Sequence, residues 1–438
     1  FPTTCGFICE HPCEARCRRN MVDDSINIRG LKRVAADFAG EVDPPQCAPD
    51  TGKKIAILGG GPGGLSAAYY LQLMGHQTTV YEMLPKLGGM LRYGIPNYRL
   101  PKDRLDDDIR AILKTGVQVK NGLKIGQDIT IQQLRQEYDV VLITIGASTD
   151  KKLGLENEDA DGILSAVQFL RNVGKNQIMD LTGKEVAVIG GGNVSMDAVR
   201  TAKRLGAKKV SIVYRRRVAD MTALPGEIDG AVAEGIELQT LKAPASIDVD
   251  ENHHVKGIYV TPQMVSSIRD GRASIKPTGE EDIYIPCDVL IVAIGQNIET
   301  HHFEQAGIPV ERGKIVTKST GAFENLPGVF AGGDCASGPA SVIKAIAAAK
   351  VVAANIDEYL GYHHEISCDV EIPKACLHDR VPCGRAELTE REACERVCDF
   401  EGVENCMTEK EAKQEACRCL RCDHFGYGIF KGGREKLW

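Results

Sequence analysis

Two glycine-rich loops of the kind that bind dinucleotides constrain the fold of this chain of 438 residues. Residues 53–82 read KKIAILGGGPGGLSAAYYLQLMGHQTTVYE, and residues 184–217 read KEVAVIGGGNVSMDAVRTAKRLGAKKVSIVYRRR. Each segment has the pattern of an apolar strand, a glycine turn, a helix of small residues and a second strand. One such loop is weak evidence, but two in this context predict an α/β fold with two Rossmann-like dinucleotide-binding domains.

The first loop has the spacing G-x-G-x-x-G at Gly59, Gly61 and Gly64. These glycines would let the backbone approach a pyrophosphate at a helix N-terminus, where unpaired N–H groups favour anions. Glu82 ends the second strand, at the place where a carboxylate accepts hydrogen bonds from ribose hydroxyls. This unit is therefore predicted to bind FAD.

The second loop carries Gly190 and Gly192, with a serine in the third glycine position. We expect these two glycines and Asn193 to hold a pyrophosphate. Arg215 stands where the first unit has its acid, and Arg216 follows it. Arginines at this place suit a 2′-phosphate, so the unit is predicted to bind NADP(H). The alternative is that the arginines form a solvated strand end and that the pocket takes NADH.

Composition excludes several other classes of protein. The formal net charge is −7 and is spread without long blocks, which argues against a nucleic-acid partner. No apolar run reaches the roughly 18 residues that a transmembrane helix requires. No signal peptide is visible, so we expect a cytoplasmic protein. The chain begins at Phe1 inside a cysteine motif, and we expect a further segment upstream.

Cysteines are concentrated at the two ends of the chain. There are sixteen, and the roughly 350 residues between the two end clusters hold only Cys47, Cys287 and Cys335. Disulfides of a secreted protein would be scattered, whereas clusters at the ends indicate metal sites. Neither half of the predicted FAD domain contains a C-x-x-C dithiol. Without that dithiol, a flavin here is expected to pass electrons to a metal cluster or a partner.

The pattern of strands and helices predicts an insertion. The segment after the first unit, YDVVLITIGAS, resembles the segment after the second, CDVLIVAIGQ, and each ends in a glycine turn, at Gly146 and Gly295. We therefore expect the NADP(H) domain to interrupt the FAD domain, between a helical cysteine-rich N-terminal domain and a cysteine-rich C-terminal extension. The expected domains are 1–52 (iron–sulfur), 53–182 (FAD, first part), 183–296 (NADP(H)), 297–360 (FAD, second part) and 361–438 (extension).

Several motifs in this order resemble one family. They are CGFICEHPCEARC with INIRGLKR, then GGGPGGLSAA, GGMLRYGIPNYRLPK, GGGNVSMDAVR, VYRRR, AIGQ and GVFAGGD with GPASVIKAIAAA. The chain resembles the pyridine-nucleotide–flavin oxidoreductases, and among them the glutamate synthase small-subunit family. That family also includes the flavin subunit of ferredoxin-dependent NADP transhydrogenases and the N-terminal half of dihydropyrimidine dehydrogenase. The match covers roughly residues 1–360.

The resemblance implies further flavin-binding residues. Asp334, after Gly333, matches the family's acid on the ribityl chain. The segment 88–101, with Gly89 and Leu91, matches the loop that lines the isoalloxazine ring. A helix that begins near Ser341 is expected to point its N-terminus at the flavin, where its positive potential favours the reduced anion.

The resemblance also implies 4Fe–4S clusters. In this family the cysteines at the positions of Cys5, Cys9, Cys13 and Cys17 are shared between two clusters, together with ligands from an upstream segment. Lys32 stands where some relatives have a Gln or Glu ligand, and Cys5 could replace that ligand. The number of complete clusters stays open, and zinc or free thiols are the alternatives.

The cysteines near the C-terminus are harder to interpret. Cys417, Cys419 and Cys422 form C-x-C-x2-C and are candidate iron–sulfur ligands. Zinc binding, free thiols or a packing motif are the alternatives.

Together these features predict an NADP(H)-dependent oxidoreductase module that passes electrons between nicotinamide, FAD and iron–sulfur clusters. It would belong to a hetero-oligomeric complex with iron–sulfur partner subunits or ferredoxin, such as a ferredoxin-linked transhydrogenase, with or without electron bifurcation. One alternative is the small subunit of an NADPH-dependent glutamate synthase. An alternative of another class is a non-catalytic scaffold with a degenerate FAD fold.

Overall fold

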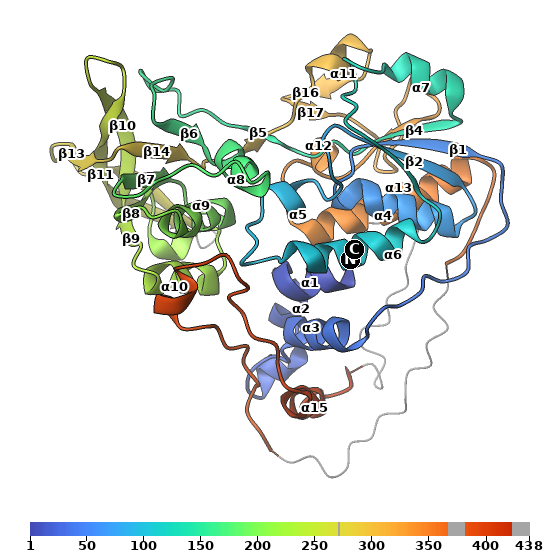
Figure 1. Ribbon diagram of the computed structural model, residues 1–438, viewed down its shortest axis with the longest axis horizontal. Helices are drawn as coiled ribbons and strands as arrows, with labels where there is room; N and C mark the ends of the chain where they lie inside the picture. Colours follow the sequence, from blue (N-terminus) through green and yellow to red (C-terminus); the bar gives the residue numbers. More distant parts are fainter. Residues whose placement is uncertain (270–271, 367–381, 423–438) are drawn as a thin grey trace.

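The computed structural model describes residues 1–269, 272–366 and 382–422. Two α/β domains stand next to each other, and helices from both ends of the chain form a layer beneath them (Figure 1). The expected fold class is confirmed: each of two parallel sheets contains a strand that leads into a glycine loop, and a helical N-terminal region precedes them.

The first domain is built on a five-stranded parallel sheet in the order β18-β4-β1-β2-β3. Strand β4 is buried throughout, as is β1 after its first residue, because both faces of the sheet are covered. Strand β18 joins beside β4 only after the chain has built the second domain, as the predicted insertion requires. The strands are β1 Lys54–Leu58, β2 Gln77–Glu82, β3 Gln118–Asn121, β4 Val140–Ile143 and β18 Val329–Ala331.

Helices cover both faces of this sheet. On one face α4 (Pro62–Leu73) packs along α13 (Val342–Tyr359), with α6 (Lys102–Leu113) beside them (Figure 1). The helices approach closely because buried alanines, such as Ala67 and Ala353, face the contact. The opposite face is covered by α7 (Ile131–Glu137) and α11 (His301–Gln305), near the small hairpin of β16 (Val310–Glu311) and β17 (Lys314–Ile315).

The second domain repeats this plan with a parallel sheet in the order β6-β14-β7-β8-β9. Apolar residues of three helices cover one face of the sheet. The strands are β6 Ile163–Ser165, β7 Glu185–Ile189, β8 Lys209–Tyr214, β9 Glu237–Thr240 and β14 Val289–Val292. The helices are α8 Ala166–Gly174, α9 Asn193–Arg204 and α10 Pro225–Ala233.

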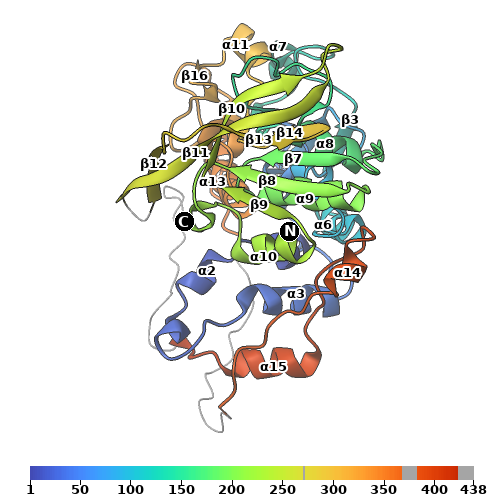
Figure 2. The ribbon, with the colours of Figure 1, turned by 90° about the vertical axis from the view of Figure 1, so that its left-hand side faces the viewer.

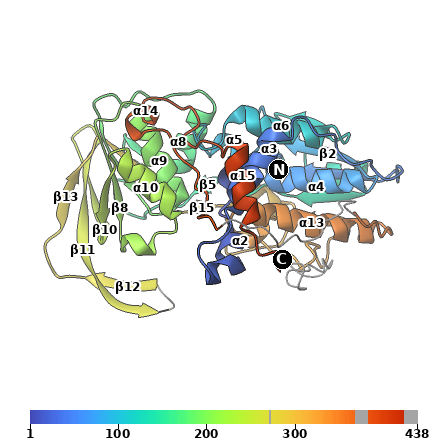
Figure 3. The same cartoon turned by 90° about the horizontal axis from the view of Figure 1, so that it is seen from below.

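An antiparallel sheet covers the other face of the second domain. Ile247, Val255 and Ile258 from this sheet pack on Ile189 and Val213 of the parallel one. Strand β11 is long and extends beyond the domain with β12 as a two-stranded arm (Figure 3). The strands are β10 Lys242–Val249, β11 Val255–Arg269, β12 Arg272–Pro277 and β13 Ile283–Pro286.

The chain passes between the domains twice, through β5 (Thr149–Asp150) and β15 (Gln296–Asn297), which pair antiparallel. The expected boundary near residue 183 differs from the structure, because β6 already pairs with β14 in the second sheet. Strand β6 is an edge strand of three residues without a glycine motif. The sequence-based prediction therefore placed the start of this domain at the glycine loop.

The helical layer joins the two ends of the chain. It contains α1 (Pro2–Ile8), α2 (Pro12–Ala15), α3 (Ile28–Phe38), α14 (Ala393–Arg396) and α15 (Glu409–Cys417). The helix expected over Ile26–Phe38 begins at Ile28, because the Asn27 side chain caps it by accepting from the Gly30 N–H. Helix α15 lies against α3 (Figure 2). Among the described residues no helix is both long and apolar enough to span a membrane.

Candidate nucleotide and electron-transfer site

A cavity of about 270 Å³ opens at the carboxyl ends of the first sheet. It is the region where open α/β sheets bind ligands. Its walls contain eight of the residues that the sequence predicted for FAD: Gly59, Gly61, Glu82, Gly89, Leu91, Gly146, Gly333 and Asp334. A smaller cavity adjoins it at Gly59 and Glu82.

The first glycine loop is shaped by close approach of the backbone. Gly59 has φ +109°, and a Cβ atom there would lie 2.6 Å from the Thr144 carbonyl oxygen. A Cβ at Gly64 would lie 2.0 Å from the Gly59 oxygen, so Gly64 serves the packing of α4 on β1 and does not line the cavity. A Cβ at Gly61 has only Gly89 within 4 Å, at 3.9 Å, and would extend into the space available for a pyrophosphate.

Glu82 is buried at the end of β2. Its two oxygens accept hydrogen bonds from the Gly60 and Leu84 N–H groups, each at 2.8 Å. Burial raises the pKa of Glu82, although these backbone bonds favour the carboxylate. The backbone therefore holds the carboxylate in a fixed orientation at the wall of the cavity.

The opposite wall is formed where the chain returns to the first domain. Asp334 begins the short helix α12 (Asp334–Ser337), and burial raises its pKa to about 6. Helix α13 begins after Ser341, as the sequence predicted, and its first residues line the cavity. The N-terminal N–H groups of α13 thus face the space expected for the flavin.

The loop expected at the isoalloxazine ring is held by residues to which sequence reasoning gave no role. Short helix α5 (Met90–Tyr93) lies in this loop. The Lys102 ammonium donates to the carbonyl oxygens of Leu91 (3.0 Å) and Ile95 (2.5 Å), and burial lowers the pKa of Lys102 to about 7. The Arg99 guanidinium donates to both oxygens of Asp197 in α9, each at 2.9 Å. This buried ion pair joins the flavin loop to the second domain.

A second cavity of about 1000 Å³ lies at the carboxyl ends of the second sheet. Its walls contain all six residues predicted for NADP(H): Gly190, Gly192, Asn193, Arg215, Arg216 and Gly295. Gly190 has φ +147°, and a Cβ there would lie 2.4 Å from the Ala293 oxygen. The second loop therefore repeats the geometry of the first.

The three arginines after β8 differ in their contacts. Arg217 pairs with Asp220 at 2.8 Å and 3.0 Å, and the Arg216 Nε donates to the Ala273 oxygen at 3.2 Å. Among the described residues Arg215 has no hydrogen-bond or ion-pair partner, and it is exposed. Arg215 is thus the best placed of the three to bind an added phosphate.

The two cavities adjoin. Asn193, Gln296 and Ser341 line both, and so does Glu10 from the N-terminal layer. The Asn193 amide is oriented by accepting from the Leu224 N–H at 3.0 Å, and its nitrogen lies 3.4 Å from a Glu10 oxygen. Two nucleotides bound in these cavities would meet at this junction.

Two N-terminal cysteines reach the first cavity. Cys5 and Cys9 line it, whereas Cys13 is exposed and Cys17 is partly buried. Burial raises the pKa of the Cys5 thiol. No three sulfur atoms of the described cysteines lie within 4.8 Å of one another. Four thiolates around one zinc ion would lie roughly 4 Å apart, so no such site is formed in the described residues.

Cys335 does not serve as a flavin dithiol. It is fully buried, and its Sγ lies 3.4 Å from the Ile143 oxygen and 3.2 Å from the Gly332 oxygen. Burial raises its pKa to about 12, which keeps the thiol protonated. The sequence-based interpretation of Cys335 as a buried small residue agrees with this environment.

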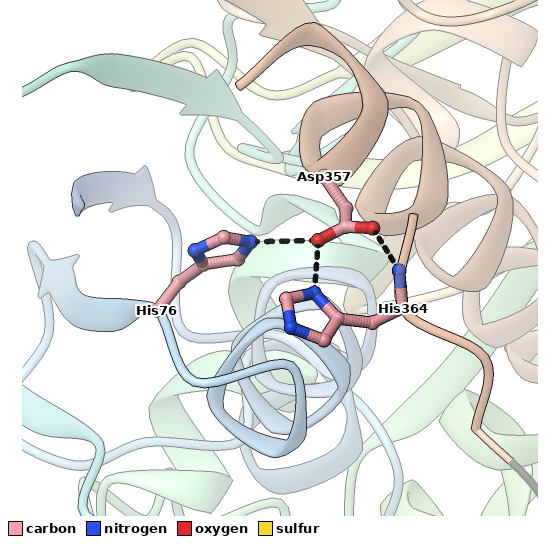
Figure 4. Close-up of side chains that lie close together, drawn as sticks. All are labelled: His76, Asp357 and His364. Atoms are coloured by element: carbon pink, nitrogen blue, oxygen red, sulfur yellow. Dashed lines mark hydrogen bonds and ion pairs between the residues drawn. The ribbon is translucent and has the colours of Figure 1, made fainter. Parts of the chain in front are cut away.

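Sequence reasoning missed a buried cluster of His76, Asp357 and His364 (Figure 4). One Asp357 oxygen lies 3.0 Å from the His76 Nε2 and 2.7 Å from the His364 Nδ1, and the other accepts from the His364 N–H at 2.8 Å. These are hydrogen-bond distances, and the contacts fasten the segment after α13 to the first domain. No sequence motif links His76 to Asp357 and His364, which lie about 280 residues further along the chain.

Comparisons with known proteins agree with this architecture. A family model described as pyridine nucleotide-disulphide oxidoreductase matches residues 53–349. The solved structure of FprA from Mycobacterium tuberculosis in complex with NADPH superposes with a TM-score of 0.61, at 21% identity, over 72% of this chain and 85% of that one. Thioredoxin reductase of T. acidophilum does so with a TM-score of 0.53, at 21% identity, over 70% of this chain and 98% of that one. Both similarities support the fold.

Curated relatives extend the match to the chain ends. The chain is 36% identical to NADP(+)-dependent formate dehydrogenase subunit beta of Moorella thermoacetica, over 98% of this chain and 66% of that protein. It is 36% identical to NADPH-Fe(3+) oxidoreductase subunit beta of Geobacter sulfurreducens, over 96% and 69% respectively. It is 33% identical to the glutamate synthase [NADPH] small chain of Escherichia coli, over 82% and 81%. The chain thus spans about two thirds of the length of the first two relatives.

Proposed function

Because the chain belongs to the pyridine nucleotide-disulphide oxidoreductase family, and within it to the glutamate synthase small-subunit family, we propose that it is an NADP(H)-dependent flavoprotein module. The module passes electrons between nicotinamide, FAD and iron–sulfur clusters. The observation that carries this proposal is the junction of the two nucleotide cavities at Asn193, Gln296 and Ser341.

The residues of the junction fit a hydride transfer that needs no acid or base from the protein. A flavin held here would supply hydride acceptance from NADPH and release of single electrons, chemistry that belongs to the cofactor. The chain's task is to position the two rings. Arg99 and Asp197 hold α9 against the flavin loop, and Lys102 holds the loop itself. The N-terminus of α13 supplies positive potential to the reduced ring.

Electrons are proposed to leave through the N-terminal layer. Cys5 and Cys9 line the flavin cavity, and Cys13 and Cys17 continue the series away from it. Cys335 directly follows Asp334 of the flavin cavity, but its thiol is buried and protonated. It therefore cannot act as the redox thiol that disulfide reduction at the flavin would need. We propose that the four cysteines are ligands of 4Fe–4S clusters, completed by a segment or subunit beyond this chain.

The relatives' names indicate a subunit of a larger complex. The two relatives that match nearly the whole chain are beta subunits, one of a formate dehydrogenase and one of an NADPH-Fe(3+) oxidoreductase. We therefore favour a cytoplasmic hetero-oligomer with iron–sulfur partner subunits or ferredoxin, as in a transhydrogenase. The glutamate synthase small chain matches less of the chain and remains the second candidate. Intact glycine loops, Glu82 and Asp334 argue against a scaffold without flavin.

The electron route is tested with the double variant Cys9→Ala/Cys13→Ala. Rapid mixing with NADPH should still bleach the flavin, because hydride transfer needs only the two nucleotide domains. Reduction of ferredoxin or of the partner subunit should fall by at least about tenfold, because one-electron carriers are lost. The control Cys47→Ala removes a thiol outside the cysteine groups at the two chain ends. It should change neither flavin bleaching nor acceptor reduction. Unchanged acceptor reduction in a well-folded double variant would exclude this route, and loss of both half-reactions would indicate a structural metal instead.

A further inference from the structure

The C-terminal extension folds against the N-terminal layer through a buried carboxylate. Glu415 of α15 is fully buried. One of its oxygens accepts from the Asn27 N–H at 2.8 Å, and the other accepts from the Ala386 N–H at 2.7 Å. The Asn27 amide in turn donates to the Ala386 oxygen at 3.0 Å. These bonds bring the chain near residue 383 beside the end of α15, where Cys417 lies.

A buried arginine fixes the turn that follows α15. Arg418 stands between Cys417 and Cys419 in the sequence and is 3% exposed. Its guanidinium donates to Asp23 at 3.1 Å and to the Asp24 oxygen at 2.7 Å, and Arg19 donates to the Arg418 carbonyl at 3.0 Å. The turn is therefore anchored to the residues that directly follow the N-terminal cysteines. Figure 3 shows α15 beside α3, which it contacts.

Two cysteine sulfurs, those of Cys383 and Cys419, have contacts in this anchored region. The Cys383 Sγ lies 4.0 Å from the Gln414 oxygen, in the last turn of α15 and one turn before Cys417. The Arg421 N–H donates to the Cys419 Sγ at 3.5 Å, and Arg421 has φ +51°, the left-handed region. A turn that directs an N–H at a cysteine sulfur stabilises that sulfur as a thiolate ligand.

We propose that Cys383, Cys417, Cys419 and Cys422 hold one 4Fe–4S cluster, with Cys383 as the ligand that the C-x-C-x2-C pattern lacks. We assign an iron–sulfur cluster and not zinc because the proposed function needs an electron carrier, and zinc has no redox chemistry.

Other cysteines of the extension are less suited to this role. Burial and a hydrogen bond from the thiol to Asp37 raise the pKa of Cys406 to about 11, so it stays protonated. Cys394 and Cys398 lie one helical turn apart and are exposed, and Cys398 Sγ contacts the Cys394 carbonyl at 3.4 Å. They lie in the stretch that runs past the second domain, where Arg396 pairs with Glu234 at 3.0 Å.

The role of this cluster as an electron carrier beside the N-terminal cysteines rests on the proposed function. Its existence is tested without NADPH. Iron and acid-labile sulfide are measured per chain in anaerobically purified full-length protein, for the wild type, Cys383→Ser, Cys419→Ser and the control Cys47→Ser. The Cys383 and Cys419 variants should each lose about four irons and four sulfides, with flavin content unchanged. The proposal would be overturned if Cys383→Ser kept as much iron as the wild type, or if the wild type contained zinc in place of iron.

A second measurement on the wild type covers the case in which the variants do not fold. Cys417, Cys394 and Cys398 are all exposed, so they are matched for access to iodoacetamide. Cys417 should be at least about tenfold slower to alkylate than the other two, because a ligand thiolate is shielded by iron. Removing the iron with a chelator and an oxidant should abolish the difference. Equal alkylation of Cys417 and Cys394 before iron removal would disprove the site, whatever the outcome for flavin reduction by NADPH.

Discussion

The two glycine loops share a backbone path and differ in the residue that ends the second strand. In the first unit Glu82 is buried and bound by two backbone N–H groups. In the second unit Arg215 is exposed and unpaired among the described residues, while its neighbour Arg217 is neutralised by Asp220. We propose that the glycines provide an anion site in each unit and that the residue at the strand end selects the nucleotide.

The largest expected effect comes from filling the first loop. Gly61→Val should place its methyl groups in the pyrophosphate space, and flavin content should fall below roughly a tenth of the wild-type value. The fold should persist, because a Cβ at Gly61 has no protein atom closer than 3.9 Å. Absorbance of bound flavin measures the first outcome and circular dichroism the second. If Gly61→Val retained full flavin, the first loop would not be the FAD site.

A smaller effect is expected from Arg215→Ala in the second loop. A charge-assisted hydrogen bond to a phosphate contributes about 1.5–3 kcal/mol, so Kd for NADPH should rise about 10- to 100-fold. Kd for NADH should change little, because NADH lacks the 2′-phosphate. Titration of protein fluorescence with each nucleotide gives both constants.

Arg217→Ala is the matched control for the Arg215 variant. Its guanidinium is already paired with Asp220, so NADPH affinity should change by less than about threefold. Equal losses for NADPH and NADH in Arg215→Ala would show that the arginine supports the fold of the loop and not the phosphate.

The smallest expected effect is on the pH dependence of stability, and it concerns Asp334, which lines the first cavity and not the second. Burial raises the pKa of Asp334 to about 6, above roughly 3.9 in an unfolded chain. The folded flavin-free protein therefore binds more protons than the unfolded chain between these values, and its stability falls as pH rises from about 4 to about 6. Asp334→Asn should remove this dependence and be about 1–2 kcal/mol more stable than the wild type at pH 7, measured by urea unfolding. If the stability of the wild type and of Asp334→Asn changed with pH in the same way, the raised pKa would not belong to Asp334.

The glycine loops made much of this protein predictable from sequence. Gly59, Gly64 and Gly190 stand where the backbone of each unit is approached closely, since a Cβ at each would strike a backbone oxygen of the same domain. Arg215 was predicted because it directly follows the strand after the loop helix, at the place where the first unit has its acid. Such signals are readable in the sequence because the strand, the glycine loop, the helix and the second strand of each unit follow one another directly in the chain.

Only the tertiary structure decided which distant segments meet. Nothing in the sequence paired Arg99 with Asp197, placed Lys102 under the flavin loop, or drew the edge strand β6 into the second sheet. The approach of Cys383 to α15 likewise depends on Glu415 and Asn27, which come from opposite ends of the chain. The sequence determined two nucleotide-binding units and their order, because backbone geometry within a unit restricts its residues. Folding decided how the units and the cysteines face one another, because contacts between distant side chains leave no periodic or spaced pattern.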